Sequence, residues 1–175
     1  KGYQIPEASR TSKGLPIVNF LSFQDQEHLA TITSVASLDD DQSYLFFATK
    51  GGTVKRTAVS QFKNIRTNGI IAIHLADDDE LLQVEKTDGS REIVLGASNG
   101  KAIRFHETDV RPCGRGAAGV KGIELSSNDH LVGMAVVTKE HNQILVVTEK
   151  GYGKRSMVDE YRLQGRGGMG VKALH

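Results

Sequence analysis

The sequence predicts an all-β fold, in which a four-stranded unit of about 50 residues repeats to give about three and a half propeller-like blades. Three observations support this prediction. A short motif recurs at nearly constant spacing, β-branched residues gather in short runs between turn residues, and the sign of the charge alternates with the same period. The 175 residues are enough for one domain with a buried core.

The repeated motif is an apolar run, a glycine turn and a second short run that ends in basic residues. Its copies are 46–55, 95–104 and 146–155. The anchor glycines are taken as Gly51, Gly100 and Gly151. Each is followed 18 or 19 residues later by a second glycine, and these are Gly69, Gly119 and Gly170. Gly14 matches this second glycine in a unit whose first half is missing.

These spacings divide the chain into four units within a single bladed domain fragment, 1–175. The approximate repeats are 1–41 (partial), 42–91, 92–141 and 142–175 (partial). Within a unit, Asn99-Gly100 between two β-rich runs predicts a hairpin, because this pair adopts the positive φ angles of a tight turn. No apolar stripe supports a long helix. Single helical turns are expected near 59–62, 108–110 and 158–161.

Charge is unevenly distributed although the net charge is only +1. Residues 50–69 hold five basic and no acidic side chains, whereas 70–98 hold two basic and seven acidic ones. Several basic residues recur in register. Lys55, Arg104 and Arg155 lie four residues after an anchor glycine, and Arg10, Arg115 and Arg166 lie four before a second glycine. Equivalent positions of stacked units align, so the pattern predicts a positive stripe.

A stripe of Lys and Arg side chains can follow the phosphates of duplex DNA and gain affinity by counterion release, without base readout. The candidate DNA-binding residues are Arg10, Lys13, Lys55, Arg56, Arg66, Lys101, Arg104, Arg111, Arg115, Lys121, Lys154, Arg155, Arg166 and Lys172. Two alternatives remain open. The charges could be solvated edge residues that prevent blades from pairing with neighbours, or the stripe could bind an acidic protein partner.

The sequence offers no organised catalytic or cofactor site. Residues 114–119 and 165–170 fit the G-x-G-x-x-G pattern, but an alternating, strand-like run at 120–125 follows the first, where a dinucleotide site needs a helix. The acidic runs 39–41 and 77–80 are interpreted as solvated turns, and the six histidines form no H-x-x-x-H pair. We therefore expect no metal, no cofactor and no catalytic residue.

Other features of the sequence indicate the compartment in which the protein works and the extent of the chain. Cys113 is the single cysteine, which excludes an internal disulfide, fits a reducing compartment and predicts a buried structural thiol. No secretory leader or membrane-spanning stretch is visible, which predicts a cytoplasmic location. The chain begins at Lys1 without a methionine, so we expect a fragment of a larger bladed domain.

Several segments together resemble the C-terminal domain of the bacterial DNA gyrase A subunit, and the corresponding domain of topoisomerase IV is a close relative. The segments are 3–10, 13–19, 64–69, 99–105, 109–112, 119–123 and 148–155. The resemblance implies a β-pinwheel whose blades exchange strands and whose basic rim wraps duplex DNA. It also implies two partners, the remainder of the gyrase A subunit plus the gyrase B subunit, in a nucleoid-associated, ATP-dependent type II topoisomerase. This chain alone is then not an enzyme.

The chain departs from the family at one motif. The family's first-blade box reads Q-[K/R]-R-G-G-[K/R]-G, whereas 164–170 here read Gln-Gly-Arg-Gly-Gly-Met-Gly and lack the basic residues at Gly165 and Met169. This segment is interpreted as the equivalent loop of a later blade. Without the true box, we expect the chain to bind DNA but to wrap it poorly. A six-bladed ring also needs more units, so chains could pair through open blade edges.

Overall fold

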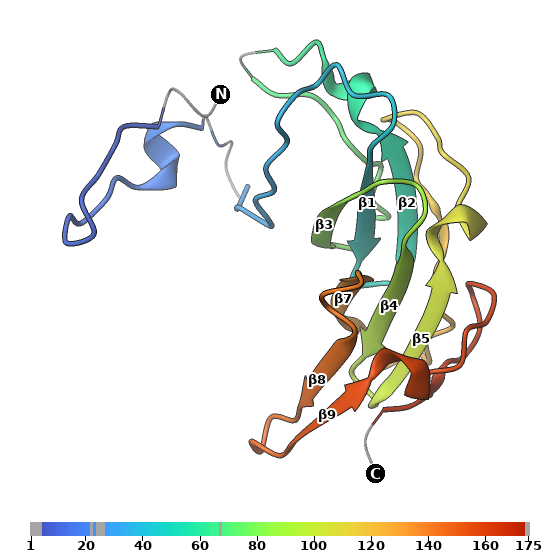
Figure 1. Cartoon of the computed structure of the whole chain (residues 1–175). Coiled ribbons are helices and arrows are strands. Elements are labelled where there is room, and N and C mark those ends of the chain that lie inside the picture. Colours follow the sequence, from blue (N-terminus) through green and yellow to red (C-terminus); the bar gives the residue numbers. More distant parts are fainter. Residues whose placement is uncertain (1–4, 22, 24–26, 67, 174–175) are drawn as a thin grey trace.

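The computed structural model describes residues 5–21, 23, 27–66 and 68–173, and these residues form an all-β structure with short 3-10 turns (Figure 1). Of the partial unit 1–41, the described residues form no strand and contain the turn η2 (Ile17–Asn19), which lies apart from the sheets. The three helical turns predicted from the sequence are confirmed. They are η3 (Val59–Phe62), η4 (Glu107–Asp109) and η5 (Val158–Glu160).

Two four-stranded antiparallel sheets and one hairpin follow each other along the chain. We call the units 42–91, 92–141 and 142–175, which contain their hairpins, the first, second and third unit. The first sheet has the order β3-β1-β2-β6, with β1 (Tyr44–Thr49), β2 (Thr53–Ala58), β3 (Leu81–Thr87) and β6 (Val120–Lys121). The second has the order β10-β5-β4-β7, with β4 (Glu92–Ala97), β5 (Lys101–His106), β7 (Leu131–Val137) and β10 (Val171–Lys172). The third hairpin joins β8 (Gln143–Val147) and β9 (Gly153–Met157).

Neighbouring units exchange their outer strands. Strand β6 follows β5 in the chain but pairs with β2 of the preceding sheet, through Val54↔Val120. Strand β10 likewise follows β9 but pairs with β5, through Ala102↔Val171. We call each segment from a 3-10 turn to the exchanged strand an exchange arm. The arms 107–121 and 158–172 end in an exchanged strand, whereas the described residues of the first arm, 59–66 and 68–71, form no strand.

The hairpin turns correct the alignment of the first unit. The turn hydrogen bonds start at the amides of Gly52, Gly100 and Gly151, and these glycines have positive φ angles of 84°, 76° and 82°. Choosing Gly51 as the anchor was therefore wrong by one residue. The Gly51-Gly52 doublet fits either register by sequence, but the turn needs its glycine at the position with positive φ. The equivalent basic residues are Arg56, Arg104 and Arg155, which we call the strand-two arginines.

Apolar residues fill the spaces between successive units. One cluster joins the first and second sheets and includes Phe46, Val54, Leu95 and Phe105, each fully buried. A second cluster joins the second sheet to the third hairpin, and Tyr161, next to η5, belongs to it. Each sheet therefore has one face toward the following unit, and a unit buries that face only when another unit packs on it.

Candidate nucleic-acid interface

Arg56 of β2 is a buried contact between units rather than a surface charge. Its Nη1 atom lies 3.4 Å from Oε2 of Glu107, in the turn η4 of the next unit, and its guanidinium lies 4.6 Å from the Tyr44 ring centroid. Glu107 is fully buried and also accepts hydrogen bonds from Thr87 Oγ1 at 2.6 Å and the Arg91 amide at 2.8 Å. The predicted phosphate contact at Arg56 is therefore wrong for this structure, because the cation is enclosed with its carboxylate.

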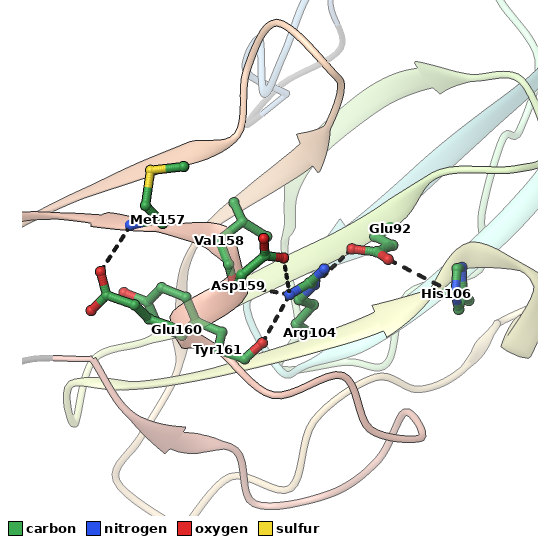
Figure 2. A network of polar contacts seen from close by, with 8 residues as sticks. All are labelled: Glu92, Arg104, His106, Met157, Val158, Asp159, Glu160 and Tyr161. Carbon is green, nitrogen blue, oxygen red and sulfur yellow. Dashed lines mark hydrogen bonds and ion pairs between the residues drawn. The ribbon is translucent and has the colours of Figure 1, made fainter.

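Arg104 of β5 makes the equivalent contact with the third unit (Figure 2). Its Nε donates to Glu92 Oε2 at 2.6 Å, and its Nη1 donates to the carbonyls of Val158 and Tyr161 at 3.0 and 3.1 Å. The Oδ1 atom of Asp159 lies 3.1 Å from the same nitrogen. Burial lowers the pKa of Arg104, but the hydrogen bonds and ion pairs with Glu92 and Asp159 outweigh it and leave the pKa raised. Arg104 is thus mostly enclosed as well.

Lys55 is fully buried, so it is also wrong as a surface DNA contact. Its Nζ donates to the Ala72 carbonyl at 2.6 Å and to the Arg115 carbonyl, and it lies 5.5 Å from the Phe47 ring centroid. Burial is the main cause that lowers the pKa of Lys55. In the corrected register Lys55 is equivalent to Ile103, so it never belonged to the repeated basic position.

Arg115 and Arg166 hold exchange arms through backbone carbonyls. Arg115 Nη1 donates to the Ile71 carbonyl at 3.0 Å, and Arg166 Nη1 makes the same contact to the Lys121 carbonyl at 3.0 Å. Arg166 Nε also donates to the Asp109 carbonyl at 3.0 Å. Arg166 remains exposed and Arg115 is half-buried, so both keep a solvent-facing side.

Lysines gather on the outer edge of the sheets, where the exchanged strands lie. The register of β10 and β5 places Lys172 directly opposite Lys101, and no salt bridge joins either lysine to a carboxylate among the described residues. In the first sheet the same register places Lys121 opposite Thr53, and Lys121 Nζ lies 2.5 Å from Glu124 Oε2. Like charges directly opposite in a sheet repel each other, so the Lys101–Lys172 pair leaves positive charge that no carboxylate among the described residues neutralises.

The remaining predicted residues are exposed but scattered. Lys154 lies 3.3 Å from Glu160, and Arg155 projects from the third hairpin. The others are Arg10, Lys13, Arg66 and Arg111, all exposed. The single positive stripe predicted from the register is therefore interrupted, because two of the strand-two arginines lie between units. Glu92 and Glu107, the carboxylates that neutralise these arginines, were not among the residues predicted from the sequence. The sequence does show that Glu92 begins the second hairpin and that Glu107 follows it directly, and this position was the signal that could have identified them.

The glycine-rich motifs serve strand exchange. Gly119 and Gly170 have φ angles of 99° and 71°, and a Cβ atom on either would lie 2.6 Å from a carbonyl oxygen, of Val54 or Ala102. Each motif leads into an exchanged strand rather than a helix.

Within the described ranges no group of three acidic, His or Cys side chains could hold a metal ion, and no helix there is long and apolar enough to cross a membrane. Cys113 is half-buried, and its amide donates to the Arg56 carbonyl at 2.9 Å.

Successive antiparallel sheets that exchange their outer strands define a propeller-like class of fold, the β-pinwheel. The model of the family described as DNA gyrase C-terminal domain, beta-propeller, matches residues 1–36, 43–88, 91–138 and 142–174. The chain belongs to this family.

Relatives and solved structures agree with this assignment. The chain is 49% identical over 173 residues to the DNA gyrase A subunit of Staphylococcus epidermidis, covering 98% of the chain but only 19% of that relative. It is similar to the C-terminal domain of DNA topoisomerase IV, with a TM-score of 0.83 and 31% identity over 91% of this chain and 49% of that one. For the DNA gyrase A C-terminal domain the values are 0.80 and 32%, over 91% and 53%.

Proposed function

We propose that the chain is a DNA-binding and DNA-wrapping module of a bacterial type II topoisomerase, equivalent to the C-terminal domain of the gyrase A subunit. Membership of the DNA gyrase C-terminal domain family supports this proposal. The module itself catalyses no reaction in the proposal. It binds duplex DNA and presents it to the strand-passage core in the bacterial cytoplasm, at the nucleoid. That core consists of the rest of the gyrase A subunit plus the gyrase B subunit.

The Lys101–Lys172 pair is the observation that supports a phosphate-binding outer edge. The two lysines face each other across β5 and β10 with no salt bridge to a carboxylate among the described residues. Lys121 occupies the equivalent outer position on the first sheet. A DNA strand that follows this edge would meet a cation on each sheet, and contacts of this kind bind the phosphate backbone without reading the bases.

This proposal assigns the predicted basic residues to two roles. Lys101, Lys121 and Lys172 bind phosphates at the outer edge, and the exposed sides of Arg111 and Arg166 extend that surface. Arg56, Arg104 and Lys55 hold the units together from the interior. Bending of the duplex follows from contacts on successive sheets that are not collinear, and it carries an elastic cost that depends on the DNA sequence.

The test is a titration with a random-sequence duplex of about 40 base pairs at several salt concentrations. If the proposal is correct, the logarithm of affinity falls linearly with the logarithm of salt concentration, with a slope of about −0.9 per neutralised phosphate. The double variant Lys101→Glu, Lys172→Glu should reduce the magnitude of that slope by about 1.8, because two phosphate contacts are lost.

A matched control separates a local effect from a general change in charge. Lys139→Glu, Lys150→Glu makes the same change in net charge after β7 and at the exposed tip of the third hairpin, on lysines that have no salt bridge among the described residues. The control should keep most of the affinity and the wild-type slope. Equal losses in both double variants would contradict an outer-edge site. Binding to an acidic protein with no salt-dependent DNA binding would instead favour a protein-interaction module.

A further inference from the structure

The outer edges of the first and second sheets carry different charges at equivalent positions. Strand β6 places Lys121 opposite Thr53, and strand β10 places Lys172 opposite Lys101. We call these two places the first edge and the second edge. The first edge has one lysine in this register where the second has two, and the sequence adds a carboxylate, Glu124, three residues after the lysine of the first edge.

Glu124 binds this lysine directly. Lys121 Nζ donates to Glu124 Oε2 at 2.5 Å, and the two side chains are 58% and 49% exposed. The residue three positions after Lys172 in the sequence is His175, so the second edge has no acidic residue at the equivalent position. The charges of Lys121 and Glu124 cancel on the first edge, whereas those of Lys101 and Lys172 add on the second.

The third unit fixes the backbone that carries Glu124. The Glu124 amide donates to the Gly168 carbonyl at 2.9 Å, and the Gly167 amide donates to the Gly122 carbonyl at 2.6 Å. These bonds attach the segment after β6 to the glycine-rich loop of the next exchange arm. The carboxylate therefore stays close to Lys121 because of backbone contacts between units, and not only because of the exposed ion pair.

A carboxylate at this place competes with phosphate for the lysine. A lysine that binds a phosphate releases a counterion from the DNA, but a neighbouring carboxylate occupies the ammonium group and repels the phosphate. Asp79 lines the same surface cavity as Lys121 and Glu124, so a second carboxylate adds to the negative charge there. The ion pair is exposed and hence weak, so DNA can displace Glu124 at a cost in affinity.

We propose that Glu124 is an internal competitor of DNA phosphate, so that duplex DNA binds the second edge first and reaches Lys121 only by displacing this carboxylate. The inference rests on the proposed function and adds an order of contacts to it. It also makes Glu124 a residue that limits DNA affinity. Removing its charge should strengthen binding, whereas removing a charge from the lysines of the two edges should weaken it.

The experiment is a salt-dependent titration of the whole chain with the same random-sequence duplex, applied to Glu124→Gln. Gln keeps the size of the side chain and the amide bond to Gly168 but has no charge. Affinity at low salt should rise about two- to fivefold, the range that corresponds to one exposed ion pair. The magnitude of the salt slope should rise by up to about 0.9, because no freed carboxylate takes up a cation when Lys121 binds phosphate.

Glu140→Gln is the matched control for this substitution. Glu140 is exposed and follows β7, at the opposite edge of the second sheet, so the variant makes the same change in net charge away from the outer edges. It should keep the wild-type slope and gain less affinity than Glu124→Gln. If the two variants bind equally well, Glu124 is not a competitor and the inference is wrong.

A double-mutant cycle shows whether the gain passes through the lysine. The gain from Glu124→Gln should disappear in a Lys121→Met background, because no ammonium group is released there. A gain that persists would be a general effect of charge and would contradict the inference.

The order of contacts has its own measurement. In the wild type, Lys172→Met should weaken DNA binding more than Lys121→Met, and the two losses should become similar in the Glu124→Gln background. Equal losses in the wild type would overturn the order. A wild-type chain without salt-dependent DNA binding would instead overturn the proposed function itself, which separates the two failures.

Discussion

The first and second units are each joined to the next unit by an arginine, but the polar contacts of the two arginines differ. In the first, Arg56 is 6% exposed and faces Glu107, a fully buried carboxylate supplied by the next unit. In the second, the Arg104 side chain is 13% exposed and is shared between Glu92 of its own hairpin and Asp159, whose side chain is 87% exposed. A repeated position can therefore keep one structural role while burial and partner change around it.

The largest difference between the two contacts should appear when the carboxylate is removed. Glu107→Ala leaves the Arg56 guanidinium buried without its charge partner, and Thr87 and the Arg91 amide lose their acceptor. Breaking a buried ion pair from one side costs about 3–5 kcal/mol of the free energy of unfolding. Urea-induced unfolding measures this loss.

The second contact supplies the control for that prediction. Glu92→Ala leaves Arg104 with Asp159 and two backbone carbonyls, so it should cost clearly less than Glu107→Ala. If the two substitutions destabilise the chain equally, burial does not distinguish the contacts and the comparison fails.

An intermediate effect is expected at the glycines that permit strand exchange. Gly119→Ala and Gly170→Ala place a Cβ atom 2.6 Å from a backbone carbonyl at a positive φ angle. Each should cost about 1–3 kcal/mol through backbone strain, and more if the arm detaches. Hydrogen exchange should show faster exchange of the amides of β6 or β10, respectively. Gly100→Asn, at a left-handed turn with no atom within 4 Å of an added Cβ, is the control and should keep both strands protected.

The sequence predicted the repeat, the all-β class and the three 3-10 turns because local patterns specify them. Asn99-Gly100 permits one register of its turn, whereas Gly51-Gly52 permits two, and the wrong choice placed Lys55 among the repeated basic residues. The partners of Arg56 and Arg104 in the next unit lie 51 and 54 to 57 residues away in the chain. A single sequence shows a repeated cation, but it does not show whether a carboxylate from the next unit encloses it.

The smallest effect is expected where the two units differ only at the surface. In the first unit the Lys50 amide bonds to the Glu80 carbonyl, and the Lys50 and Glu80 side chains form an exposed ion pair at 2.5 Å. In the second unit the equivalent residues are Ser98 and His130, which keep the backbone bond and add a Ser98 Oγ contact to the His130 amide at 3.0 Å.

The backbone bond rather than the ion pair should therefore join these loops in both units. Lys50→Ser should unfold at the same urea concentration as the wild type within error, because exposed ion pairs contribute little and are screened by salt. Repeating the measurement at low and high salt provides the check. A clear destabilisation that disappears at high salt would show that the first unit depends on this charge pair. The two units would then differ in how much this surface contact contributes to the free energy of unfolding, and not only in the residues that make it.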